Sequence, residues 1–242
     1  MISKIIDNLK TLIIALFIAV IIRSLLFQPF YIPSSSMEPS LLVGDRIFVS
    51  KYTYGYSKHS FPFSPPILNK RIFSSEPKYG DLIVFKTPSD NRTDFIKRLI
   101  GLPGDKIQIK NGILLINDKA IQKEKINENY EIKCGGQYTE VTFFNEILPN
   151  NFKHITVYNK IGSMINSDEY IVPKEHYFFL GDNRDCSRDS RFLSSVGYVH
   201  KDNLVGKARL IFFSNDTDKG SVFKIWNWKN SFRLERTFKK LK

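Results

Sequence analysis

A run of twelve uncharged, mostly apolar residues, Thr11–Ile22, constrains the fold of this chain more than any other feature. After Arg23 and Ser24, apolar character resumes through Leu25–Phe27. A helix over residues 11–27 would be roughly 26 Å long at ~1.5 Å per residue. That length is short but sufficient for a hydrocarbon core of ~30 Å. We therefore expect a transmembrane helix at residues 11–27, with Arg23 near one end, where its head can reach the interface.

A cleaved signal peptide is the alternative for this segment, because Lys4 and Lys10 precede it as in a basic n-region. However, no small-residue cleavage site follows the apolar run directly, and the first such cluster, Ser34–Ser36, comes late and after a proline. We therefore favour an uncleaved anchor. Lys4 and Lys10 precede the apolar run Thr11–Ile22, whereas a single basic residue, Arg23, directly follows it. This excess of positive charge before the run places residues 1–10 in the cytoplasm and the remainder of the chain on the far side.

The rest of the chain contains short β-type runs separated by turn residues. Aromatic residues make up 14% of the chain, which also favours strands. The regular spacing of the short β-type runs suits an antiparallel β-barrel or sandwich. The runs are 46–50, 81–86, 95–100, 106–110, 113–116, 141–144, 155–158, 177–180 and 204–213.

Three regions depart from this pattern. Residues 117–170 are rich in Lys, Asn and Glu, and we interpret them as an inserted, smaller β subdomain between the two parts of the main β domain, 28–116 and 171–215. Ser57–Ser75 is rich in Pro, Ser and Phe and is typical of a loop. Residues 216–242 form a basic segment that we expect to contain a final strand and a membrane-surface patch. Its aromatic residues include Trp226, Trp228 and Phe232.

The net charge of +12 favours an anionic partner, either nucleic acid or an anionic membrane surface. Because the apolar segment already commits the chain to a membrane, we expect an anionic phospholipid bilayer and no nucleic acid. The chain has four histidines and two cysteines, and no C-x-x-C motif, so we expect neither a metal site nor a cofactor.

Three polar segments need an explanation beyond folding, and the first follows the apolar run. In Pro33–Leu41, a serine cluster is flanked by prolines, which favours a fixed extended or turn conformation. If the segment is extended, Ser34 and Ser36 project from the same face. By itself such a segment is also typical of a simple linker.

The second segment, Asp94–Asp105, contains a lysine in an apolar setting. In a strand, Lys97 shares a face with Phe95 and Leu99. Burial there would lower the pKa of the lysine and make it a usable base, whereas an edge-strand lysine that prevents aggregation is the ordinary alternative. The third segment, Gly181–Arg191, alternates turn formers with paired charges, as a hydrogen-bonded polar loop or a solvated turn does.

Together with Tyr79–Lys86, these three segments resemble the four ordered boxes of the bacterial type I signal peptidases, a family of membrane-anchored Ser-Lys proteases. The match follows the family's order from about Phe30 to Ile211. The resemblance implies a serine endopeptidase that removes N-terminal signal peptides from exported preproteins, cutting after a small residue. It also implies a single-pass protein of the bacterial inner membrane, with its catalytic β domain on the extracytoplasmic side.

The resemblance assigns roles residue by residue. Ser36 matches the nucleophile, and Lys97 matches the general base. Ser34 matches the hydroxyl that joins the Ser36 backbone N–H in the oxyanion hole, and Ser187 matches the serine that orients the lysine amine. The residues implied to line pockets for small substrate side chains are Phe30, Ile32, Met37, Leu41, Ile47, Phe95 and Ile96.

Asp189 and Arg191 match a supporting ion pair, and we expect Asp189 to pair with Arg191 rather than with the base. The chain departs from the family pattern at Cys186, where Asn is usual, and at Phe192–Ser194, where an aromatic residue and Gly are usual. It also has one apparent membrane span where the family often has two. An oxidising compartment would allow a Cys134–Cys186 disulfide. We do not expect this bond, because one cysteine lies in the insertion and the other in the polar loop.

A non-enzymatic, membrane-anchored β domain that binds partners is the main alternative function. The presence of Ser36, Lys97 and Ser187 argues against it, since a binding module need not keep all three. A self-cleaving repressor with a Ser-Lys pair would require a DNA-binding domain, whereas this N-terminus carries an apolar span.

Overall fold

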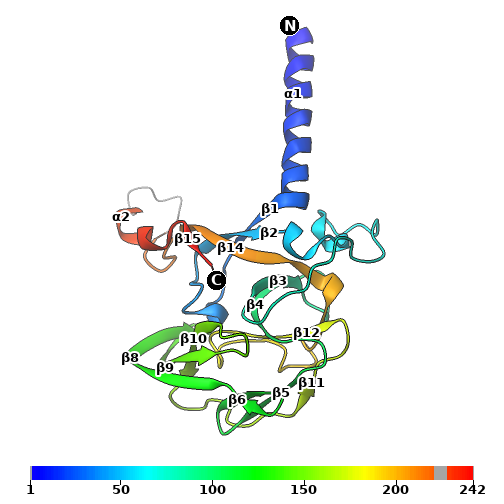
Figure 1. Cartoon of the computed structure of the whole chain (residues 1–242). Coiled ribbons are helices and arrows are strands. Elements are labelled where there is room, and N and C mark those ends of the chain that lie inside the picture. The colour runs from blue at the N-terminus through cyan, green and yellow to red at the C-terminus, as the bar shows by residue number, and fades with distance from the viewer. Residues whose placement is uncertain (1, 221–227, 242) are drawn as a thin grey trace.

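The N-terminal helix projects from one end of a β-rich body in the computed structural model, which describes residues 2–220 and 228–241 (Figure 1). Helix α1 (Ile2–Ile21) continues as a π-helical turn over Ile22–Leu26. Within the described residues, one helix, Lys4–Leu26, is long and apolar enough to cross a membrane. It begins earlier than the expected span and ends one residue sooner, because Phe27 already pairs in the first strand.

Among the described residues, eight strands form the main sheet, and every pairing in it is antiparallel. The last long strand, β14, lies between β2 and β3. The sheet is curled, so the expected mainly β fold behind one apolar helix is confirmed. In spatial order the strands are β1 (Phe27–Tyr31), β2 (Asp45–Ser50), β14 (Leu204–Ser214), β3 (Leu82–Lys86), β4 (Asp94–Gly101), β12 (His176–Leu180) and β13 (Val199–His200), and β15 (Lys239–Lys240) pairs with β14.

In the described part of the chain, two smaller sheets lie at the end of the body away from α1 (Figure 1). One has the order β11-β5-β6-β7, and the other, which we call the inserted sheet, has the order β10-β9-β8. The inserted sheet lies wholly within residues 117–170, whereas β7 and the start of β11 pair with strands outside that range. The bounds are β5 (Lys106–Lys110), β6 (Ile113–Ile116), β7 (Lys119–Ala120), β8 (Gln122–Cys134), β9 (Gln137–Ile147), β10 (Lys153–Asn159) and β11 (Tyr170–Ile171).

The remaining regular structure is short. Ser57–Ser75 is mostly irregular, with one 3₁₀ turn at Lys58–Ser60, and an isolated bridge joins Tyr56 to Ile72. The C-terminal segment contains α2 (Trp228–Ser231) and the expected final strand, β15. Trp226 lies outside the described residues. Four other 3₁₀ turns lie within the described residues, at Ser35–Met37, Tyr52–Tyr54, Lys201–Asn203 and Leu234–Arg236.

Strand β4 sets the geometry of the site because both Lys97 and Arg98 are buried in it. Consecutive strand residues project to opposite faces. Lys97 therefore points toward the segment after β1, while Arg98 points toward the loop after β12. On the face of β4 that carries Lys97, Phe95 and Leu99 pack in an apolar cluster with Ile83, the residue paired with Lys97 on β3.

The structure contradicts the expectation that the two cysteines stay apart. Cys134 and Cys186 form a disulfide, with their Cα atoms 5.7 Å apart. The reason is the length of β8 and β9, which form a hairpin with Cys134 near its tip. The hairpin extends far enough for its tip to reach the polar loop that follows β12, although 52 residues separate the two cysteines in sequence.

Candidate active site

The serine expected to be the nucleophile lies where β1 gives way to a tight turn. Ser34 is extended, and Ser35–Met37 form a single 3₁₀ turn. The Nζ of Lys97 donates a hydrogen bond to the Oγ of Ser36 at 2.5 Å. The Oγ of Ser34 lies 3.3 Å from that same Oγ. Side chains that are 61 residues apart in the chain, Ser36 and Lys97, are thus in direct contact.

Lys97 is 4% exposed, and burial lowers the pKa of its amine to about 8. Asp189 and Asp182 act in the opposite direction but do not offset the burial. The carboxylate of Asp189 instead accepts from the Arg191 guanidinium at 2.8 Å, as expected. A lysine with a pKa near 8 is partly neutral at physiological pH, so its amine can accept a proton.

The polar loop, residues 181–191, folds back on the nucleophile segment. The carboxylate of Asp189 accepts from the backbone N–H of Gly181 at 3.0 Å. A Cβ at Gly181 would lie 2.3 Å from the Oγ of Ser187 and 2.5 Å from the carbonyl oxygen of Ser36. These separations are too short for any side chain, so only glycine allows Ser187 and the Ser36 backbone to approach this closely. The sequence marked Gly181 as a turn former, not as a contact residue.

Ser187 is buried, and its Oγ has no hydrogen-bond partner within the residues that the structure describes. The loop thus brings Ser187 beside Gly181 and the Ser36 carbonyl, without a hydrogen bond to the lysine amine. An unpaired buried hydroxyl is costly to maintain.

Asn183 joins the polar loop to the nucleophile segment, and sequence reasoning did not single it out. Its backbone N–H donates to the carbonyl of Ser36 at 3.2 Å, and its Nδ2 donates to the carbonyl of Ser35 at 3.2 Å. Both contacts fix the backbone around Ser36. In the sequence, Asn183 was noted only as part of the Gly181–Arg191 segment.

A second missed contact is the buried ion pair between Arg98 and Asp182. The guanidinium donates two hydrogen bonds to the carboxylate, at 2.7 and 2.6 Å, and a third to the carbonyl of Gly80 at 2.7 Å. Such a bidentate pair has strict geometry. It therefore fixes β4, and with it Lys97, relative to the polar loop.

An apolar groove of about 490 Å³ opens beside the Ser36–Lys97 pair. Ser34, Ser36 and Lys97 all line it, and so do Cys186 and Arg188, which sequence reasoning did not assign to it. Leu41 does not line the groove and packs in the apolar core instead. The other residues expected in the substrate pockets, Phe30, Ile32, Met37, Ile47, Phe95 and Ile96, all line it.

The residues described here include no group of three or more His, Cys, Asp or Glu side chains that could hold a metal ion.

The family model for signal peptidase, peptidase S26, matches residues 5–213. This chain belongs to the signal peptidase family. It is 41% identical to a signal peptidase I of Rickettsia typhi over 241 residues, which cover 93% of this chain and 89% of that protein. Its identity to a signal peptidase I of Rickettsia conorii is 42% over 241 residues, covering 93% and 88% respectively.

Among solved structures, the chain is similar to a signal peptidase I from Enterococcus faecalis, with 25% identity and a TM-score of 0.34. The match covers 55% of this chain and 97% of that one. The resemblance found in the four ordered segments is confirmed by the family match, and with it the prediction of a serine peptidase. A catalytically silent binding module is not favoured. As a member of this family with an apolar N-terminal helix, the chain is membrane-anchored.

Proposed function

We propose that this chain is a membrane-bound serine endopeptidase that removes N-terminal signal peptides from exported preproteins, with Ser36 as nucleophile and Lys97 as general base. The observation that carries the proposal is the 2.5 Å hydrogen bond from the buried Lys97 amine to the Ser36 hydroxyl, at the wall of an apolar groove. A serine is a weak nucleophile unless a base lies within hydrogen-bond reach, and the lowered pKa of Lys97 makes it such a base.

In the reaction, neutral Lys97 takes the proton of Ser36 as the hydroxyl oxygen attacks the scissile carbonyl carbon. The resulting oxyanion accepts hydrogen bonds from the Ser36 backbone N–H and from the Ser34 hydroxyl. Protonated Lys97 then gives its proton to the leaving amine of the mature protein, and the C–N bond breaks. Water, deprotonated by Lys97, cleaves the acyl-serine ester in the second half of the reaction.

Ser187 and the Asp189–Arg191 pair act around this centre. Ser187, buried beside Gly181 and lacking a partner, orients the Lys97 amine once substrate occupies the groove. The ion pair holds Asp189 away from the amine, since a carboxylate paired with Lys97 would keep the lysine charged. By pairing with Asp189, Arg191 thus helps to keep the Lys97 amine neutral.

The groove favours an extended substrate with small side chains. Residues 30–34 and 93–97 form its two sides, and Ile47 and Val84 also line it. A peptide lying extended beside these segments turns alternate side chains to the same side, into a shallow apolar floor. We therefore propose cleavage after a small residue, with a second small residue two positions earlier.

The helix and the charge distribution support a proposal for the membrane topology. The helical segment ends at Leu26, and Ser36 follows only ten positions later, so the nucleophile lies close to the end of the membrane span. We propose that residues 1–10 are cytoplasmic and that the β domain lies on the extracytoplasmic side of the bacterial inner membrane. The net charge of +12 suits an anionic phospholipid surface, and we expect no nucleic-acid partner.

The test is cleavage of a preprotein by the detergent-solubilised full chain, compared with Ser36→Ala. The matched control is Ser35→Ala, because the Ser35 hydroxyl lies 3.5 Å from the Cys186 sulfur and is not hydrogen-bonded to Lys97. We expect cleavage by the wild type and by Ser35→Ala and none by a folded Ser36→Ala protein. Wild-type turnover by Ser36→Ala would reject the assignment.

A further inference from the structure

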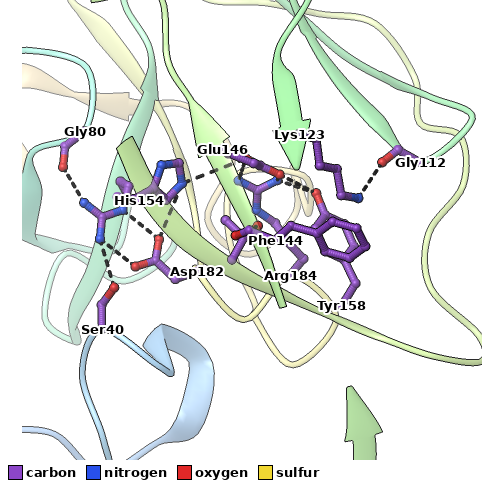
Figure 2. A network of polar contacts seen from close by, with 12 residues as sticks. Ser40, Gly80, Gly112, Lys123, Phe144, Glu146, His154, Tyr158, Asp182 and Arg184 are labelled. Carbon is purple, nitrogen blue, oxygen red and sulfur yellow. Dashed lines mark hydrogen bonds and ion pairs between the residues drawn. The ribbon is translucent and has the colours of Figure 1, made fainter. Parts of the chain in front are cut away.

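The inserted sheet attaches to the polar loop at several independent points. The first is a buried ion pair between Arg184, in the loop, and Glu146, on β9, with N–O distances of 2.9 and 2.5 Å (Figure 2). Tyr158 on β10 completes it, because its hydroxyl donates to Glu146 at 2.8 Å and accepts from Arg184 at 2.6 Å. Burial alone would raise the pKa of Glu146, but Arg184 holds it below its usual value, so both partners are charged.

The second point of attachment is made by the backbone of β10. The N–H of Val157 donates to the carbonyl of Asp182, and the N–H of Arg184 donates to the carbonyl of Val157, both at 2.9 Å. The carboxylate of Asp185 accepts from the N–H of Asn159 at 2.9 Å. Residues 182–185 of the loop are thus paired with a strand that belongs to the insertion.

His154 lies between the two ion pairs of this region (Figure 2). Its Nε2 is 3.9 Å from both the Glu146 carboxylate and the Asp182 carboxylate. Burial, followed by the charge of Arg98, lowers the pKa of His154 to about 4, so the ring is neutral at neutral pH. The contacts of the inserted sheet thus extend through His154 and Asp182 to Arg98, the neighbour of the base.

The third attachment is covalent and lies closest to the chemistry. The Cys134–Cys186 disulfide joins the tip of the β8–β9 hairpin to the residue just before Ser187. Cys186 also lines the groove. Both cysteines are half-buried, in contrast to the fully buried Glu146–Arg184 pair. Of the three attachments, the disulfide is therefore the one that a change in solution redox conditions can reach.

We propose that Cys134 is a positioning residue for the peptidase reaction: through its disulfide to Cys186, the inserted hairpin holds Ser187 and the adjacent groove wall in their working positions. The peptidase is accordingly active at full rate only when this thiol pair is oxidised. This inference rests on the proposed function, because Ser187 matters only if Lys97 is the base. Neither cysteine touches the reacting atoms, so the effect is exerted through Ser187.

The chemical step is a thiol–disulfide exchange. A dithiol reductant attacks one sulfur, the Cys134–Cys186 bond breaks, and a mixed disulfide forms. The second thiol of the reductant then releases the other cysteine, so that two protons and two electrons pass to the protein thiols and the reductant becomes a cyclic disulfide. The Glu146–Arg184 pair and the β10 hydrogen bonds remain, so reduction loosens the Cys186–Ser187 end of the loop without unfolding it.

The experiment measures kcat and KM of the full chain in detergent with a peptide substrate, before and after dithiothreitol treatment, with free thiols counted by a chromogenic reagent. Misplacement of a catalytic group by about 1 Å can cost up to about 10² in rate. We expect kcat to fall about tenfold on reduction, KM to change less than about twofold, and reoxidation to restore kcat. The acidic limb of the kcat profile, which reports the substrate complex, should move as well. Ser187 acts on Lys97 in that complex, and a merely structural bond would not move this limb.

Three variants make the result specific. Cys134→Ser should behave like the reduced wild type and should not respond to dithiothreitol. Cys134→Ser/Cys186→Ser should also be insensitive to the reductant. Gln137→Ala, opposite Cys134 in the hairpin and exposed, keeps the disulfide and should retain wild-type kcat and its sensitivity to reduction.

The possible outcomes separate the two proposals. Unchanged kcat in enzyme with two free thiols per chain overturns the positioning role and leaves the proposed function intact. A loss of kcat on reduction that Cys134→Ser does not reproduce also overturns it. If neither the oxidised nor the reduced wild type cleaves a preprotein, the proposed function itself fails. Circular dichroism before and after reduction identifies a loss caused by unfolding, which would equally contradict a positioning role.

Discussion

The protonation of Lys97 gives the sharpest test of the proposed dyad. Burial lowers the pKa of this amine from 10.5 to about 8. At pH 7 a lysine with that pKa is about 9% neutral, against about 0.03% for an unperturbed one. Burial therefore increases the fraction of usable base at neutral pH by about 300-fold. The rate constant kcat/KM should rise about tenfold between pH 7 and pH 9, with an apparent pKa of about 8.

The same shift has a stability cost whose sign follows from linkage. The folded-state pKa of Lys97 lies below the unfolded value, so at low pH the fold has to hold a buried cation. A shift from 10.5 to about 8 corresponds to about 3 kcal/mol. This penalty is fully present below pH 8 and disappears as the pH rises from about 8 to 10.5. Lys97→Met should therefore unfold at higher urea concentration than the wild type at pH 7.

The assay is a pH profile of kcat/KM from pH 5.5 to 10, measured on the full chain in detergent. Two control variants remove other groups that titrate nearby. Burial lowers the pKa of Lys51 to about 8 as well, but Lys51 donates to Gln28 and does not line the groove. Burial raises the pKa of Glu38, two residues from the nucleophile, to about 7. In both Lys51→Met and Glu38→Gln, the acidic limb of the kcat/KM profile should keep its apparent pKa of about 8.

The proposed dyad is rejected if Lys51→Met or Glu38→Gln shifts the acidic limb of the kcat/KM profile. It is also rejected if the limb lies near pH 6, where an exposed histidine titrates. It also fails if Lys97→Arg stays active, because a guanidinium remains protonated throughout the range.

Four further changes test other parts of the site. Ser34→Ala should lower kcat by about 10²–10³ with a smaller change in KM, since it removes one oxyanion donor; steady-state kinetics that show a change in KM alone would make Ser34 a ground-state binding residue. Gly181→Ala should reduce kcat at least about tenfold, because its Cβ would collide with Ser187 Oγ at 2.3 Å; wild-type kinetics would refute that contact. The pKa of His154 lies at about 4, below its unfolded value, so stability should fall by about 2 kcal/mol from pH 7 to pH 5; urea titrations should show a smaller fall for His154→Gln. Deleting residues 1–26 should leave a domain that still binds anionic vesicles in a flotation assay, and indifference to lipid charge would contradict the proposed surface.

Local patterns in the sequence predicted most of the main sheet. The run 204–213 corresponds to β14, and the run 177–180 lies within β12. Strand β1 was missed because Phe27–Tyr31 continues the apolar character of the helix and contains a proline. Strand β8 was missed because Gln122–Cys134 is mostly polar, and both of its ends lack the apolar alternation that marks a half-buried strand.

A resemblance carried by ordered motifs placed Ser36 and Lys97 in one site, and the two side chains are in contact in the structure. Contacts that depend on the path of the chain were not predictable in this way. Asn183 reaches the carbonyl of Ser35, 148 residues away, and the disulfide crosses from the insertion to the polar loop. Each depends on where a hairpin or loop ends in three dimensions, which local residue patterns do not determine.

The position of β14 in the main sheet has a consequence for when the peptidase becomes active during its own synthesis. Strands β1 and β2 lie on one side of β14 and lead to Ser36, whereas β3 and β4 lie on the other side and carry Lys97. The strand that joins the two halves begins at Leu204, near the C-terminal end of the chain. A nascent chain that has not reached this strand holds its nucleophile and its base on separate hairpins. Pairing of such distant segments is also intrinsically slow. We therefore expect a newly made chain to become active only after its last long strand has paired with β2 and β3.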